Sequence, residues 1–136
     1  MVGHTKIEQG DIDGNPETAG DPAWQPLINN PNYPDYISGA SSVAGSITRT
    51  LALFFGTDEM TFDVTSVAPQ VMKNPRRTYH RFSDGAQDVV DARVNLGIHF
   101  RTADEVARTQ SRRVAKWVFH HFLLPVDESD EDDDRD

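Results

Sequence analysis

The sequence predicts an all-α protein, a helical bundle preceded by an irregular N-terminal segment. Three segments, residues 38–55, 83–96 and 102–122, carry apolar residues at helical spacing, and each is followed closely by glycine or proline. Only residues 61–67 alternate and are rich in β-formers, so we expect a short extended stretch at best there. The length of 136 residues allows one domain, and no apolar run reaches the roughly 18 residues of a membrane span.

The first 37 residues form the first of three predicted regions, 1–37, 38–124 and 125–136. Turn-forming sequences recur in it, Asp-Gly-Asn-Pro at residues 13–16 and Asn-Pro-Asn-Tyr-Pro at residues 30–34. They are too dense for a helix or a central strand, so an extended, irregular segment is expected. Its large side chains are expected to pin it to an apolar surface: Trp24, Leu27, Tyr33 and Tyr36.

The first predicted helix, residues 38–55, combines small residues near its start with an apolar stripe. The small residues permit close approach of a neighbour or a ligand. Gly56 is expected to end the helix. The small residues are Gly39, Ala40, Ala44 and Gly45, and the stripe is formed by Val43, Ile47, Leu51, Phe54 and Phe55.

The second and third predicted helices have start and stop signals of their own. Ser83 is the expected N-cap of the second, and Gly97 ends it. Thr102-Ala103-Asp104-Glu105 matches a capping box at the start of the third, and Pro125 follows its end. Their apolar positions are Ala86, Val89, Val90 and Val94 in the second helix, and Val106, Val114, Trp117, Val118 and Phe122 in the third.

Three helices joined by long connections give a thin core for a chain of this length. We therefore expect exposed apolar surface that is covered by a partner. The sequence leaves two partners open, a second copy of the chain in a homo-oligomer or additional helices on the N-terminal side.

The charge is concentrated at the C-terminus. The net charge is −9, and the last ten residues, 127–136, contribute −7, which leaves −2 for residues 1–126. Region 125–136 is expected to be disordered, and it could recruit a basic partner. Without a basic stripe, non-specific nucleic-acid binding is not expected. The chain has no cysteine, which excludes disulfides and thiolate metal sites. No signal peptide is visible, and the compartment stays open.

Two segments carry residues suited to binding an anion. Ser38–Gly39 lies where the first helix begins, and unpaired backbone amides, a hydroxyl and a glycine at such a point can bind an oxyanion. Arg93 and His99 flank the Gly97 turn, where a guanidinium can grip a phosphate-like group and an imidazole can act as nucleophile or metal ligand. Taken singly, each segment is better explained by a structural role, as a serine N-cap and as an arginine near a helix end.

The combination resembles a known superfamily, the vanadium-dependent haloperoxidases and type 2 phosphatidic acid phosphatases, and in particular the bacterial haloperoxidase-related proteins. The resemblance rests on three motifs in the family's order: Tyr33-Pro34-x-Tyr36-x-Ser38-Gly39, Phe54-Phe55-Gly56-Thr57-Asp58, and Arg93-x5-His99-Phe100-Arg101. It implies a helical bundle that binds phosphate or vanadate. Ser38, Gly39 and Arg93 would hold the oxyanion, and His99 would be the phosphatase nucleophile or the vanadium ligand of a peroxidase.

Three positions depart from the family pattern. Ala40 replaces the histidine that would act as general acid, a step usually worth about 10²–10⁴ in rate. Val2–Gly3 stands where an Arg-Pro pair of the first motif would be, and Lys6 is out of register. Asp104, one place later than usual, is carried over as the acid that orients His99. Two functions therefore stay open, an enzyme with impaired activity or a truncated or degenerate non-catalytic interaction module.

Two other clusters of charged residues and histidines give weaker predictions of function. Arg76, Arg77 and Arg81 form a basic group that is expected to be a solvated loop. His120 and His121 lack a metal-ligand spacing and are expected at the surface near a helix end.

Overall fold

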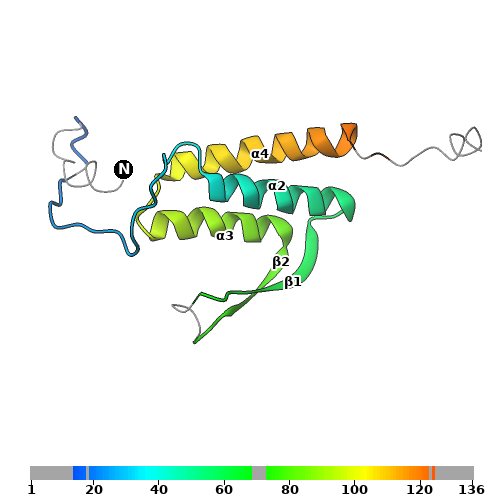
Figure 1. The fold of residues 1–136 in the computed structure, drawn as a ribbon, viewed down its shortest axis with the longest axis horizontal. Helices are drawn as coiled ribbons and strands as arrows, with labels where there is room; N and C mark the ends of the chain where they lie inside the picture. Colours follow the sequence, from blue (N-terminus) through cyan, green and yellow to red (C-terminus); the bar gives the residue numbers. More distant parts are fainter. Residues whose placement is uncertain (1–13, 18, 69–72, 123, 125–136) are drawn as a thin grey trace, which may run out of the picture.

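A computed structural model describes residues 14–17, 19–68, 73–122 and 124. Its elements are α2 (Gly39–Phe54), β1 (Glu59–Thr65), β2 (Arg76–Arg81), α3 (Phe82–Asn95) and α4 (Arg101–His121) (Figure 1). The three helices lie within one residue, at each end, of the ranges predicted from the sequence. The described part of the N-terminal segment up to Ser38 contains no helix or strand, as its turn-forming composition indicates.

The helices lie side by side, with α2 packed against both α3 and α4 (Figure 1). α2 and α4 run in the same direction, and α3 runs the opposite way. The start of α2, the end of α3 and the start of α4 therefore meet at one end of the bundle. The β1–β2 hairpin projects from the other end (Figure 1).

Small residues bring α2 and α4 together. A Cβ atom placed on Gly45 would lie 2.4 Å from Ser111 Oγ and 3.0 Å from the Arg108 carbonyl oxygen, so only glycine fits at this crossing. The core is correspondingly built from small side chains, with one valine, one isoleucine and one phenylalanine. The buried apolar residues are Ala52, Phe82, Ala86, Val90, Ile98, Ala103, Ala107 and Ala115.

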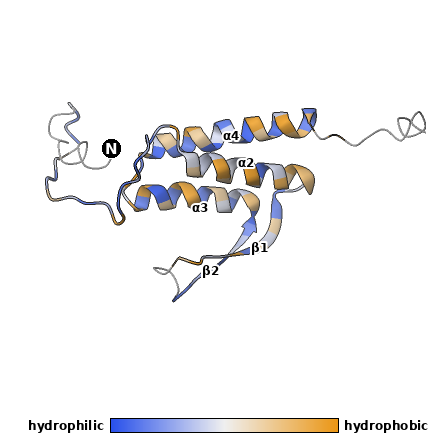
Figure 2. Ribbon diagram, viewed as in Figure 1, coloured by the Kyte–Doolittle hydropathy of each residue, from blue (hydrophilic) through white to orange (hydrophobic). Residues whose placement is uncertain are grey.

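The large apolar residues of α2 and α4 face outward. Val43 and Ile47 on α2 are 59% and 55% exposed, and Val114 and Trp117 on α4 are each 54% exposed. Figure 2 shows hydrophobic residues along both helices. The stripe read from the sequence is therefore not the core of this bundle, because the helices pack through their glycine, alanine and serine faces instead. A groove between them is lined by Ile37, Ser42, Val43, Ser46, Gln110, Ser111 and Val114.

The prediction of a purely all-α protein is wrong in one respect, since a two-stranded antiparallel sheet joins α2 to α3. Aromatic stacking holds this hairpin to the bundle. The Phe62 ring lies 5.4 Å from that of Tyr79 and 5.5 Å from that of Phe82 at the start of α3. β1 overlaps the extended stretch predicted at residues 61–67, whereas β2 escaped prediction because charged and polar residues fill most of it and it lacks the usual alternation.

Two local predictions at the hairpin also need correction. The basic group lies on β2 and not on a loop, and each arginine pairs with a carboxylate: Arg76 with Asp63, Arg77 with Asp88, and Arg81 with Glu59. Ser83 does not cap α3, whose N-cap is Arg81 without a side-chain hydrogen bond. The Ser83 amide instead donates to Asp58 Oδ1 at 3.0 Å, and its hydroxyl donates to Asp58 Oδ2.

The acidic C-terminal region 125–136 lies outside the described residues, and so do Val2–Gly3 and Lys6. In the part of the chain that is described, no helix has the combination of length and hydropathy that crossing a membrane requires.

Candidate oxyanion site

Ser38 ties the start of α2 to the start of α4. Its side chain accepts a hydrogen bond from the Ser41 amide at 3.3 Å, which confirms the N-cap predicted there. Its own amide donates to the Ala103 carbonyl oxygen at 3.3 Å. Ser38 and Ser41 are both completely buried, so the two helix starts are joined by hydrogen bonds inside the protein.

The Gly97 turn brings His99 back beside Arg93. Gly97 has φ +74°, which favours glycine, and the Ile98 amide donates to the Arg93 carbonyl oxygen at 3.3 Å. The chain therefore reverses immediately after α3. A Cβ on Gly97 would lie 2.6 Å from the Trp24 ring, because the N-terminal segment packs directly on the turn.

Arg93 meets His99 on the Nε2 side of the ring. The distance from Arg93 Nη2 to His99 Nε2 is 3.2 Å, and the same Nη2 donates to the Tyr33 hydroxyl oxygen. Arg93 Nε is buried and has no hydrogen-bond partner among the described residues. Such a donor is rare in a folded protein, and it calls for an acceptor that the described residues do not supply.

Asp104 holds the opposite side of the His99 ring. His99 Nδ1 lies 3.1 and 3.2 Å from the two Asp104 carboxylate oxygens, and the Ser41 hydroxyl donates to Asp104 Oδ1 at 2.6 Å. The predicted capping box is therefore wrong. The N-cap of α4 is Phe100, without a side-chain hydrogen bond, and the completely buried Asp104 points to His99.

These contacts define the tautomer of a neutral His99. A carboxylate only accepts hydrogen bonds, so Nδ1 carries the proton and donates it to Asp104. A guanidinium only donates, so Nε2 keeps its lone pair and faces Arg93. The lone pair on Nε2 is the group that a nucleophile or a metal ligand requires, and the carboxylate at the other nitrogen fixes the orientation of the ring.

Asp35 is a second carboxylate at this histidine, and it was not among the site residues predicted from the sequence. Its Oδ1 lies 3.5 Å from His99 Nδ1 and has no hydrogen-bond partner among the described residues. Burial raises the pKa of the Asp35 carboxyl, although the nearby His99 opposes this shift. Its place in Tyr33-Pro34-Asp35-Tyr36, next to the Ser38–Gly39 motif, was the one available signal.

The structure thus brings together Ser38, Arg93, His99 and Asp104, through direct or relayed hydrogen bonds. Gly39 is exposed, and nothing lies within 4 Å of a Cβ placed on it, so the backbone is open to an approaching group. Ala40, half-buried, offers neither a donor nor an acceptor side chain at the position of the family's general acid. Sequence reasoning missed the role of Ser41 behind Asp104 and the hydrogen bond from Arg93 to Tyr33.

The fold and this arrangement of side chains define a helical domain of the vanadium haloperoxidase type. The chain belongs to the family described as the VCPO second helical-bundle domain, whose model matches residues 1–128. No curated protein sequence gives a significant match.

Solved structures agree with this family. The crystal structure of a bacterial vanadium-dependent iodoperoxidase is similar, with 31% identity and a TM-score of 0.65 over 78% of this chain and 25% of that one. Apo- and holo-type bacterial vanadium-dependent chloroperoxidases share the fold at 19% identity and a TM-score of 0.56. They are matched over 71% and 72% of this chain and 23% of theirs. The chain therefore spans about a quarter of the length of these enzymes.

The residues present fit an oxyanion such as vanadate. The buried Arg93 Nε is a donor without a described partner, the Nε2 lone pair of His99 faces the same guanidinium, and the Gly39 backbone is open. An oxyanion needs hydrogen-bond donors for its oxygens, and vanadium can in addition accept the lone pair of a nitrogen; the described residues offer groups of both kinds.

Proposed function

We propose that this site binds vanadate or phosphate, with His99 Nε2 as the atom that contacts vanadium or phosphorus. One observation carries the proposal: Asp104 fixes the proton of His99 on Nδ1, and this directs the Nε2 lone pair toward an arginine with a free buried donor. Membership in the haloperoxidase-related family supports it.

Each residue of the chain has a physical task in this proposal. Arg93 supplies the positive charge and donates to the oxyanion, while the Ser38 hydroxyl and the Gly39 amide are further donors at the start of α2. Asp104 and Ser41 hold the imidazole in one orientation, so that little entropy is lost when Nε2 binds. Bound vanadate would supply the activation of peroxide that oxidises a halide.

A phosphate ester would instead be attacked by His99 Nε2. The bond from nitrogen to phosphorus would form as the bond to the departing alkoxide breaks, and the alkoxide would have to take its proton from water because Ala40 has none to give. We therefore propose low phosphatase activity, about 10²–10⁴ below that of a site with a histidine general acid.

The local charge limits the affinity. Among the described residues that form the site, Arg93 is the single arginine or lysine, while Asp35 and Asp104 are carboxylates. Each charge-assisted hydrogen bond contributes about 1.5–3 kcal/mol, so a site with one guanidinium should bind a multiply charged anion weakly, with a Kd of about 1 mM.

Titration with orthovanadate, followed by ⁵¹V NMR, tests the proposal. The wild-type chain should broaden and shift the vanadate signal, and His99→Ala should abolish this effect. His80→Ala is the matched control, because His80 is exposed on β2 and contacts Thr61. Equal titrations for the His99 and His80 variants would contradict the proposal.

A second candidate function is a non-catalytic module that binds another protein surface. The exposed apolar residues of α2 and α4 favour it, because contiguous apolar patches usually mark an interaction site. Sedimentation velocity tests whether the partner is a second copy: Val114→Glu should shift a dimer to monomer, whereas Val67→Glu on another exposed valine should not. A wild-type chain that is monomeric at high concentration excludes the second copy as the partner.

A further inference from the structure

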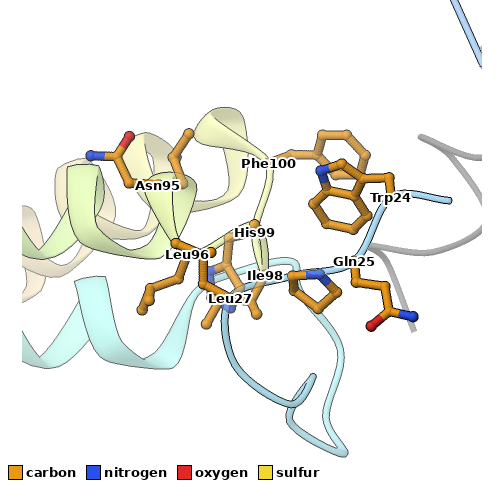
Figure 3. A pocket seen from close by; sticks show the side chains of 11 residues that line it. Trp24, Gln25, Leu27, Asn95, Leu96, Ile98, His99 and Phe100 are labelled. Atoms are coloured by element: carbon orange, nitrogen blue, oxygen red, sulfur yellow. The ribbon is translucent and has the colours of Figure 1, made fainter. Parts of the chain in front are cut away.

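A pocket of about 430 Å³ lies against the loop that carries His99. It is formed between the N-terminal segment and the link from α3 to α4 (Figure 3). Its lining residues are Trp24, Gln25, Pro26, Leu27, Val94, Asn95, Leu96, Gly97, Ile98, His99 and Phe100. This volume falls in the usual range of small-molecule sites, about 300–1,000 Å³.

The lining is apolar and aromatic. None of the lining residues is an aspartate, glutamate, lysine or arginine, and the amides of Gln25 and Asn95 lie at its margins in Figure 3. The His99 side chain is only 1% exposed and is engaged with Asp104 and Arg93. The pocket therefore suits an uncharged, flat, largely apolar molecule, because a buried charge would find no partner in it.

Specific contacts hold the two walls of the pocket together. The Leu27 amide donates to the Leu96 carbonyl oxygen at 3.0 Å, which fixes the N-terminal segment to the end of α3. The Trp24 ring packs on Gly97, where any side chain would overlap it. The concave shape thus results from a defined docking of residues 24–27 on the Gly97 turn.

We propose that this pocket binds a small, neutral aromatic molecule. His99 is common to the two sites, since it lines this pocket and contacts Arg93 in the oxyanion site. Binding in the pocket does not depend on the proposed function of the oxyanion site.

The two tryptophans of the chain allow a test with an internal control. Trp24 lines the pocket, whereas Trp117 is 54% exposed on α4. In ¹H–¹⁵N NMR spectra of the full chain at pH 7, phenol should shift the Trp24 indole N–H signal along a saturable curve and leave that of Trp117 almost unmoved. Benzoate, a charged ring of similar size, should bind at least about tenfold more weakly.

A variant confirms the location without disturbing the core. Leu27 lines the pocket but is 78% exposed, so Leu27→Asp should fold and should lower phenol affinity about tenfold. Val67→Asp makes the same charge change at a 91% exposed residue outside the pocket and should leave affinity unchanged. Parallel shifts of both indole signals, or equal phenol affinities of the two variants, would overturn the proposal.

The same samples separate this proposal from that for the oxyanion site. Arg93→Ala should weaken the effect on vanadate while phenol still shifts the Trp24 signal with unchanged affinity, because Arg93 is not among the residues that line the pocket. Phenol binding without vanadate binding would leave a ligand pocket in a protein with a different function. Vanadate binding without a phenol-induced shift would refute only the pocket.

Discussion

The arginines at the two ends of the bundle are held in different ways. On the hairpin, Arg76, Arg77 and Arg81 each pair with a carboxylate and remain more than half exposed. At the other end, Arg93 contacts the Tyr33 hydroxyl and the Nε2 atom of His99. Its own Nε has no partner among the described residues.

This difference separates structural charges from a binding charge. The hairpin pairs neutralise one another in water, where such pairs contribute about 0–1 kcal/mol each. The carboxylates at the helix-end site are directed to His99, and Arg93 is left without a bonded carboxylate. A guanidinium whose buried Nε has no partner among the described residues can bind an anion, whereas three paired surface arginines offer little to bind.

The largest expected effect concerns Asp104. Asp104→Ala would leave His99 Nδ1 and the Ser41 hydroxyl unpaired in the interior, and we expect a loss of about 3 kcal/mol in the free energy of unfolding. Asp63→Ala, which removes the carboxylate partner of Arg76 on the hairpin, should change the stability far less, because this ion pair lies in solvent. Urea unfolding of both variants measures the difference, and equal losses would erase the contrast between the two ends.

The second-largest expected effect concerns Arg93 and should appear in the affinity for the anion. Arg93→Ala should weaken vanadate or phosphate binding about 30-fold, because a charge-assisted hydrogen bond contributes about 2 kcal/mol. Arg77→Ala removes an equal charge from the hairpin and should change the affinity less than about twofold. Calorimetric titrations provide the measurement. Similar effects of the two variants would mean that only net charge matters.

Substitutions of two glycines compare the packing at the α2–α4 crossing with the packing beside the hairpin. Gly45→Ala places a methyl group 2.4 Å from Ser111 Oγ and should destabilise the protein by about 1–3 kcal/mol. Gly85→Ala in α3 meets only the Phe62 ring at 3.5 Å, so its higher helix propensity should stabilise the protein by about 1 kcal/mol. Thermal unfolding shows whether each substitution raises or lowers the stability. A stabilising Gly45→Ala would show that the crossing is looser than described.

The smallest expected effect concerns Asp35 and depends on pH. Burial raises the pKa of its carboxyl, so the folded state favours the neutral form, and stability is lost as the pH rises through the raised pKa. Asp35→Asn should match the wild type below the ordinary carboxyl pKa of about 3.9 and exceed it by about 1 kcal/mol at pH 7. Urea unfolding at several pH values tests this. A constant difference across the pH range would exclude titration of Asp35 as its cause.

The sequence predicted the helices well because apolar spacing and glycine stops are local signals. It predicted the wrong buried face for α2 and α4, because periodicity finds Val43 or Trp117 but cannot show that a partner helix prefers the glycine and alanine side. The second strand of the hairpin was missed because Arg-Arg-Thr-Tyr-His-Arg carries no apolar alternation, and the contact of Phe62 with Phe82 at the start of α3 is made only in the folded protein.

The site residues Ser38, Arg93 and His99 could be chosen from their sequence motifs. How they come to lie close together is determined by the packing of the helices. Asp104 shows the limit of local rules. The Thr-x-x-Glu pattern around it predicts a cap, but burial beside His99 gives its carboxylate a different partner. Asp35 was out of reach, because no spacing in the sequence connects it with a histidine more than sixty residues away.

The common direction of α2 and α4 has an electrostatic consequence at the site. The aligned peptide dipoles place about half a positive elementary charge at each of their N-termini, while the end of α3 contributes one opposing C-terminus. The backbone alone therefore leaves a small positive potential where the three helix ends meet. Neither protonation nor a side-chain substitution removes this backbone contribution, which partly offsets the negative charge of Asp35 and Asp104 at the end of the bundle that carries His99.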